Sequence, residues 1–266
     1  MRHVLVLAAA LLAAPLQGQS LADRIAAVGS GTVRLQFASR EGVCGNGRGN
    51  ISISRDSDRG ITTGSSSESS TGGSRAREWE DECERGPVRL AVDVTARTVT
   101  DVRAYVGGRW RGEANLDLGE VSAAEASRWL VQLAATGAEK PAKGAIFPAM
   151  IADAPDPWER LLAIAKDEGR PRGVRSSATF WVAQVAEAAA TRGLQEIVES
   201  DGDREVRKQA VFALSQRPKD ESVPALIRLA RTSRDPEIRR TAVFWLGQSR
   251  DDRALRYFEE VLLARR

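Results

Sequence analysis

Few side chains in this sequence are suited to acid–base or nucleophilic chemistry. The only histidine is His3, which stands ahead of an apolar run at the start of the chain. If that leader is removed, as argued below, the mature chain contains no imidazole. A Ser-His-Asp triad, a Cys-His dyad and any metal site that needs histidine are then excluded. This absence removes most hydrolase mechanisms.

The remaining chemical candidates are the carboxylates of Glu78–Glu84, which reads Glu-Trp-Glu-Asp-Glu-Cys-Glu. Two carboxylates can perform general acid–base catalysis without histidine, and Glu80 and Glu82 are the candidates for it. The cluster could also bind a hard cation, but its spacing matches no calcium loop. A solvated acidic face is the simpler interpretation, so we predict no cofactor, no metal and no enzymatic activity.

The start of the chain bears on whether the two cysteines, Cys44 and Cys83, form a disulfide. Residues 1–19 look like a secretory signal, because a basic start precedes the apolar run Val4–Ala14, which is too short to span a bilayer. An uncleaved membrane anchor is the alternative. Export to the periplasm or exterior favours a Cys44–Cys83 disulfide over two free thiols. No other segment is apolar enough to cross a membrane.

Composition limits the possible partners. The 266 residues carry a formal charge of only +3, and 42% of them are hydrophobic, which is enough for ordinary cores in two domains. Charges of both signs are mixed along the chain, with no long Lys/Arg stripe. Nucleic-acid binding is therefore not expected.

The N-terminal part has the alternation of half-buried strands. The alternating segments are Thr32–Ala38, Ile51–Ser54, Val88–Val94 and Thr98–Val106. A short helix is expected over Leu21–Val28, a turn at Ala96-Arg97 joins the last two strands, and the Ser/Gly-rich stretch 56–77 is predicted to be a loop. Residues 20–118 are thus predicted to form a small antiparallel β-rich domain that contains the disulfide.

A tryptophan between two arginines follows the predicted hairpin. Gly107-Gly108 ends the hairpin and is followed by Arg109-Trp110-Arg111. Such a tryptophan can act as a ligand platform through cation–π contacts. More often it covers the apolar side of a small sheet. These three residues are candidates for partner binding on the N-terminal domain.

A connecting segment, residues 119–140, links this domain to the C-terminal half. Ser122-Ala-Ala-Glu125 is a capping box, and the helix that it opens is predicted to end near Ala135. Residues 136–144 are predicted to be a linker.

The C-terminal half, residues 141–266, repeats one phrase. The copies begin at Val174, Val206 and Ile238, each 32 residues after the one before. A fixed period of this length indicates stacked helical units, because a single unit cannot bury its apolar face alone. We expect each unit to have two helices, the second of which contributes one residue to an apolar column. The column residues are Leu162, Leu194, Leu226 and Phe258.

The repeated phrase, Asp-Pro-x-Ile/Val-Arg-x-x-Ala-x-x-x-Leu-Gly in its fullest form, resembles the bacterial HEAT-like repeat family. That resemblance implies an α-solenoid in which aspartates and arginines form a ladder between units. The matching positions are Arg175, Arg207, Arg239, Asp203 and Asp235. The first copy departs from the pattern, since Pro171 stands where the aspartate is expected. The fold class predicted is α+β, with the β-rich domain followed by the solenoid.

One face of the repeat departs from the usual pattern. At 100° per residue, one side of the first helix carries the predicted core positions Val174, Ala178, Trp181 and Val185. Phe180 points roughly opposite, as do Phe212 and Phe244 in the next copies. Exposed apolar rows usually mark a contact surface, although a neighbouring helix or domain could also cover them. The three phenylalanines are our candidates for binding a protein partner.

The function we predict is that of an exported, non-enzymatic scaffold or protein-binding module, which uses the surface of the helical array. The alternative is an enzyme or regulatory subunit that acts on cell-envelope material through carboxylates of the N-terminal domain.

Overall fold

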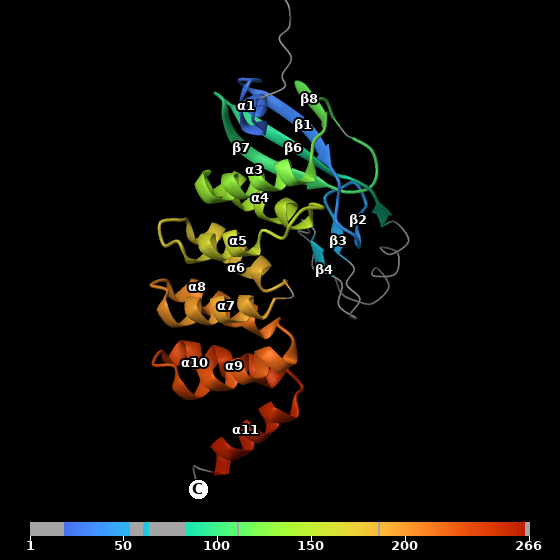
Figure 1. The fold of residues 1–266 in the computed structure, drawn as a ribbon. Coiled ribbons are helices and arrows are strands. Elements are labelled where there is room, and N and C mark those ends of the chain that lie inside the picture. The colour runs from blue at the N-terminus through green and yellow to red at the C-terminus, as the bar shows by residue number, and fades with distance from the viewer. Residues whose placement is uncertain (1–18, 54–60, 64–82, 111, 186, 264–266) are drawn as a thin grey trace, which may run out of the picture.

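The computed structural model describes residues 19–53, 61–63, 83–110, 112–185 and 187–263. Strands gather in the N-terminal part, and the helices that follow stack in layers beneath them (Figure 1). The signal segment up to residue 18, Glu80, Glu82 and Arg111 lie outside the described residues, so the predictions made for them stay predictions.

The main sheet has the strand order β7-β6-β1-β8. It follows a short helix, α1 (Leu21–Ala26), as expected from the sequence. Strands β1 (Gly31–Phe37), β6 (Val88–Thr95) and β7 (Thr98–Tyr105) pair antiparallel. The turn between β6 and β7 places Ala96 and Arg97 at φ values of 49° and 63°, the left-handed conformation of tight hairpin turns. The predicted hairpin is thereby confirmed.

The fourth strand, β8 (Leu116–Glu120), runs parallel to β1, so the sheet is mixed rather than purely antiparallel as expected. The reason lies in the residue before it. The Asn115 side chain accepts a hydrogen bond from the Thr32 backbone N–H at 2.8 Å, and the Asn115 N–H donates to the Thr32 carbonyl at 2.9 Å. The chain therefore enters beside the start of β1 and continues in the same direction.

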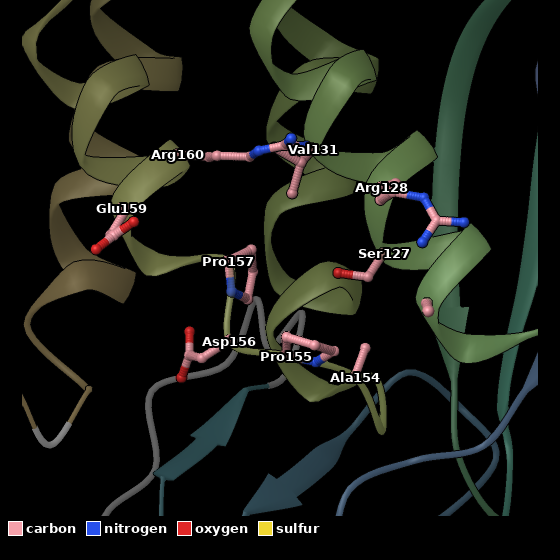
Figure 2. A pocket seen from close by; sticks show the side chains of 10 residues that line it. Ser127, Arg128, Val131, Ala154, Pro155, Asp156, Pro157, Glu159 and Arg160 are labelled. Atoms are coloured by element: carbon pink, nitrogen blue, oxygen red, sulfur yellow. The ribbon is translucent and has the colours of Figure 1, made fainter.

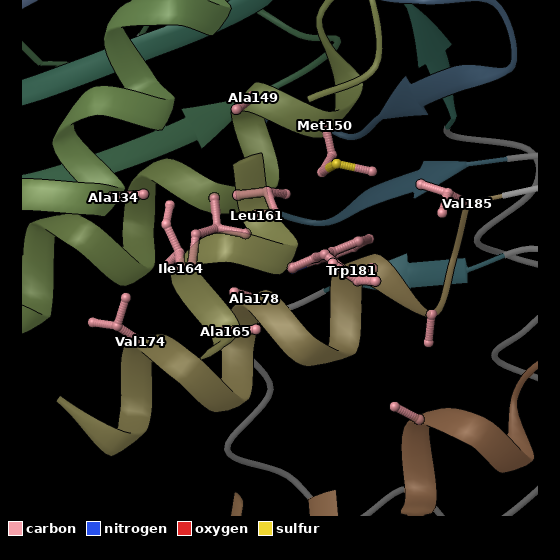
Figure 3. Close-up of a cluster of buried hydrophobic side chains, with 14 of the residues drawn as sticks. Ala134, Ala149, Met150, Leu161, Ile164, Ala165, Val174, Ala178, Trp181 and Val185 are labelled. Atoms are coloured by element: carbon pink, nitrogen blue, oxygen red, sulfur yellow. The ribbon is translucent and has the colours of Figure 1, made fainter. Parts of the chain in front are cut away.

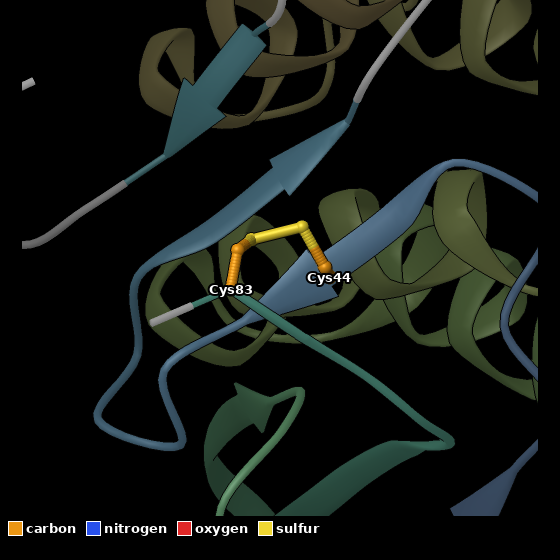
Figure 4. Close-up of a disulfide and its surroundings, with 2 residues drawn as sticks. All are labelled: Cys44 and Cys83. Atoms are coloured by element: carbon orange, nitrogen blue, oxygen red, sulfur yellow. A yellow bond between two sulfur atoms is a disulfide. The ribbon is translucent and has the colours of Figure 1, made fainter. Parts of the chain in front are cut away.

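A second, smaller sheet has the order β4-β3-β2-β5. Its strands are β2 (Val43–Gly45), β3 (Ile51–Ile53), β4 (Ile61–Thr63) and β5 (Glu84–Arg85). Strand β4 falls within the stretch predicted to be loop, because three consecutive β-branched residues favour a strand. The disulfide between Cys44 and Cys83 is confirmed, with Cα atoms 5.3 Å apart, and it joins β2 to the residue before β5 (Figure 4).

The two sheets meet at the turn after β7. Gly107 has φ +69°, and a Cβ atom there would collide with the backbone carbonyl of Gly45, so only glycine fits. The Gly47 N–H donates to the Val106 carbonyl at 2.8 Å, and the Gly108 N–H donates to the Glu84 carboxylate at 2.6 Å. The small sheet and its disulfide therefore fix the chain that leads to Trp110.

Helices α3 (Ala123–Thr136) and α4 (Glu139–Ile151) lie against the main sheet (Figure 1). The capping box is confirmed, because the Ser122 hydroxyl accepts from the Glu125 N–H. The predicted linker is wrong from Glu139 onwards, since Pro141 lies in the first turn of α4, where a missing N–H costs nothing. At Gly144 the helix approaches the backbone of Val102 in β7 so closely that an added Cβ would lie 2.6 Å from its carbonyl oxygen.

The repeat region continues with antiparallel helix pairs. Its helices are α5 (Trp158–Lys166), α6 (Arg172–Val182), α7 (Ala188–Ser200), α8 (Arg204–Ser215), α9 (Lys219–Thr232), α10 (Pro236–Gln248) and α11 (Asp252–Leu263). The closest pairs are α3 with α4, α5 with α6, α7 with α8 and α9 with α10. The expected grouping joined α6 with α7 instead, because a period fixes the length of a unit but not where it begins.

The predicted core face of the repeats is confirmed. Val174, Ala178, Trp181 and Val185 are all buried, and Figure 3 shows them with Leu161 and Ile164 of α5. Of the predicted apolar column, Leu194 and Leu226 are buried, whereas the end positions Leu162 and Phe258 are half-buried. Buried side chains form one continuous cluster from the sheets to α11, so sheet and helices share a core. In the described part of the chain, no helix combines the length and apolarity needed to cross a bilayer.

Candidate binding surfaces

Aspartate–arginine pairs link the repeat units, and one of them, Arg207 with Asp235, joins two of the predicted ladder positions. Asp203 and Asp235 cap α8 and α10, and each accepts a backbone hydrogen bond from the glutamate two residues later at 2.9 Å. Arg207 reaches Asp235 of the next unit at 2.6 Å. The N–H of Glu237 and the charges of Arg204 and Arg207 hold the pKa of Asp235 below its ordinary value.

In the first copy the buried partner of Arg175 is Asp201, not Asp203. Asp203 pairs instead with the exposed Arg172 at 2.5 Å. Arg239 donates to the carbonyl of Ser233 at 2.6 Å, within its own unit. The ladder implied by the family resemblance therefore runs between neighbouring units, while its individual partners depend on where each connecting loop places an aspartate.

The phenylalanines of the repeat belong to a continuous aromatic row across α4, α6, α8 and α10. The aromatic row consists of Phe147, Phe180, Trp181, Phe212, Phe244 and Trp245. The ring of Phe180 stacks on that of Phe212 with centroids 6.4 Å apart, and Phe212 lies 5.0 Å from Trp245. Phe180 and Phe212 are half-buried, whereas Phe244 is 56% exposed. The row thus emerges from the core towards its C-terminal end.

Further exposed apolar side chains surround that end of the array. They are Val243, Leu255, Val261, Leu262 and Leu263, all but the first on α11. Isolated exposed apolar residues are ordinary, but a group of this size on a terminal layer is typical of a contact surface. Sequence reasoning did not single out these α11 residues, because it assigned this helix to the core of the array through the column position Phe258.

Trp110 is surrounded by arginines other than those predicted. Its neighbours in sequence are Arg109, which is exposed, and Arg111, which lies outside the described residues. The guanidinium carbons of Arg34 and Arg89 lie 4.7 and 5.5 Å from the centroid of its ring. Both arginines project from the sheet face opposite the shared core, so the tryptophan lies on the polar side of the sheet. The expectation that it covers the apolar side is wrong.

A shallow cleft of about 300 Å³ lies between α3 and the connection from α4 to α5 (Figure 2). Arg128 and Arg160 line it together with Asp156 and Glu159. Asp156 pairs at 3.4 Å with Arg40, which lies in the connection between β1 and β2. Charges of both signs are thus mixed in the cleft, and nothing in its geometry singles out a reacting pair.

Of the acidic segment, the structure describes Cys83 and Glu84 only, and Glu84 receives the N–H of Gly108. The catalytic alternative involving Glu80 and Glu82 therefore concerns residues outside the described ones. Within the described ranges, no group of three or more His, Cys, Asp or Glu residues is placed to hold a metal ion.

Strand-rich sheets followed by stacked, regularly spaced helix pairs define an α+β protein with a helical repeat region. Within that class, residues 191–266 match the family model of HEAT repeats. The match runs from α7 to the end of the chain and leaves the sheets outside it. A comparison with curated proteins found no match to this chain.

Proposed function

We propose that the protein is an exported, non-enzymatic binding module that holds a protein partner on the C-terminal face of its helical array. The observation that carries the proposal is the aromatic row, which ends in the exposed Phe244 beside the apolar residues of α11. Aromatic side chains that are rigidly held and exposed are the typical anchors of protein interfaces. HEAT-like arrays often act through such extended surfaces.

The disulfide supports export. Disulfides form and persist in oxidising compartments and are rare in the cytosol, and the leader resembles a secretory signal. The mass of the mature protein, measured on material from the periplasm and the medium, would test this part. A protein that retains residues 1–19 and is recovered from the cytosol would contradict it.

A photo-crosslinking amino acid placed at position 244 tests the binding surface. We expect it to form a specific adduct in cells, whereas the same group at the exposed position Arg109 should give different adducts. The crosslinker is then moved to position 243, so that position 244 can be varied. Phe244→Ser should reduce capture of the same partner from position 243 at least tenfold. Unchanged capture by the folded variant would remove the aromatic row from the binding surface, and substrate turnover would contradict the non-enzymatic role.

A further inference from the structure

Two arginines on one face of the main sheet differ in their partners. Arg103 of β7 forms ion pairs with Asp93 at 2.5 Å and with Asp101 at 3.1 Å. Lys140 of α4 adds a second cation to Asp101 at 2.9 Å. The hydrogen bonds with Asp93 raise the pKa of Arg103 above its ordinary value. Each of these charged groups at this end of the sheet face therefore has a partner of opposite charge.

Arg89 of β6 lies on the same face and has no such partners. Its side chain is only 7% exposed, and among the described residues it forms neither a hydrogen bond nor an ion pair. Within the described ranges, the specific contact of its guanidinium is with the ring of Trp110, whose centroid lies 5.5 Å away. Burial lowers the pKa of Arg89, and the charge of Glu84 opposes that effect only in part. In the described part of the chain, the nitrogen atoms of Arg89 are not among the buried side-chain atoms that lack a hydrogen-bond partner, so the guanidinium reaches solvent and is available to a ligand.

The neighbours of Arg89 suit a planar, singly charged group. Gln36 lies directly opposite it on β1, is half-buried, and its side-chain amide also makes no hydrogen bond within the described part of the chain. Arg34 donates to the carbonyl of Gly112 at 2.5 Å, which holds the loop that carries Trp110 across the sheet. The ring of Trp110 thus lies beside two side chains, Arg89 and Gln36, that can donate hydrogen bonds to a ligand.

We propose that Arg89, Gln36 and Trp110 form a binding site for a single carboxylate of a peptide or protein ligand. A guanidinium presents two parallel N–H groups that match the two oxygens of a carboxylate, and the amide of Gln36 supplies another donor. A dianionic phosphate fits less well, because Glu84 lies nearby and Glu120 pairs with Gln36 on its other side. The site lies on the sheet and not on the aromatic row, so it stands or fails independently of the proposed function.

The indole N–H resonance of Trp110 reports on this site in the full chain labelled with ¹⁵N-tryptophan. It is identified as the signal that is missing from Trp110→Phe. Sodium acetate is titrated against acetamide as the neutral isostere, with sodium chloride keeping the ionic strength constant. We expect a saturable shift with acetate only. Arg89→Met should weaken the apparent binding at least tenfold, whereas Arg85→Met, which removes an exposed arginine of β5, should leave it unchanged.

Two peptides then distinguish the sources of the carboxylate. One is acetyl-triglycine with a free C-terminus, and the other is acetyl-aspartyl-glycinamide, whose only carboxylate is a side chain. Tighter binding of either peptide than of acetate supports the proposal and identifies the source. The absence of a saturable acetate shift, its persistence in Arg89→Met, or tighter binding of inorganic phosphate than of either peptide would overturn it.

Thermal unfolding without ligand gives a second criterion. If Arg89 serves a ligand, Arg89→Met should unfold at the same or a higher temperature than the wild type, because methionine packs against Trp110 without a buried charge. If Arg89 serves only to hold the sheet, the variant should unfold at a lower temperature, and the proposal would be wrong.

Discussion

The two ends of the helical array are built from the same kind of helix but end differently. At the N-terminal end, α4 lies on β7, and Gly144 allows the backbones to approach closely. At the other end, α11 leaves Leu255, Leu262 and Leu263 exposed in the described structure. A repeat unit always carries two apolar faces, so its environment decides whether a face becomes core or surface. The comparison shows that the sheet takes the place of a terminal repeat.

The largest expected effect concerns the interior between the two ends. Arg175→Met would leave the carboxylate of Asp201 buried without its cation, which should cost about 3–5 kcal/mol of unfolding free energy. Urea denaturation followed by circular dichroism measures it. The matched control is Arg207→Met, where Asp235 keeps Arg204 and the N–H of Glu237, so the loss should be about 1 kcal/mol. Equal losses in the two variants would mean that burial of the pair does not matter.

The second prediction concerns the N-terminal end alone. Replacing both Cys44 and Cys83 by serine opens a loop with a sequence separation of 39 residues. The chain-entropy model predicts a loss of about 4 kcal/mol, because the unfolded chain gains freedom. If the sheets and helices unfold as one unit, strand and helix signals should shift together in urea. A helical transition that stays at the wild-type midpoint would show that the ends are thermodynamically separate.

The two ends also offer a matched pair of helical glycines. Gly144→Ala should cost about 1–3 kcal/mol, because the new Cβ meets the backbone of Val102. Gly247→Ala in α10 has open space and should stabilise the protein by about 0.5–1 kcal/mol through its helix propensity. Thermal unfolding of both variants gives the signs. A stabilising Gly144→Ala would show that α4 and β7 are not in close contact.

The smallest effect is expected at the open end. Leu262 is 68% exposed, so Leu262→Ser should change the unfolding free energy by no more than about 0.5 kcal/mol. It should nevertheless raise the solubility limit in ammonium sulfate, because it removes exposed apolar surface. The buried Leu194→Ser serves as the control and should destabilise strongly. A large loss for Leu262→Ser would show that the position is covered in solution.

Local signals predicted what depends on neighbours in sequence. The capping box at Ser122 and the turn at Ala96-Arg97 were readable, because each is decided within a few residues. The period of the repeat was readable as well, since 32-residue spacing repeats the same packing problem. The disulfide followed from the number of cysteines and the inferred compartment.

What escaped prediction depends on contacts between distant residues. The direction of β8 is decided by Asn115 meeting Thr32, far earlier in the chain. The partners of Trp110 are Arg34 and Arg89, which lie on adjacent strands, and strand register cannot be read from the residues beside the tryptophan. The partner of Arg175 depended on the shape of one loop. The candidate site on the sheet therefore required the structure.

Because α4 shares a core with the sheet, local unfolding of the helical array should begin at its C-terminal end. A linear array whose units touch only their neighbours can open from either end, and each end opens more easily than the middle. Here one end is held by β7, whereas α11 packs on α9 and leaves its other face open. Backbone amides should therefore exchange with solvent fastest in α11 and progressively more slowly towards α4. A partner that occupies the open end would slow exchange there without forming any new contact with the sheet.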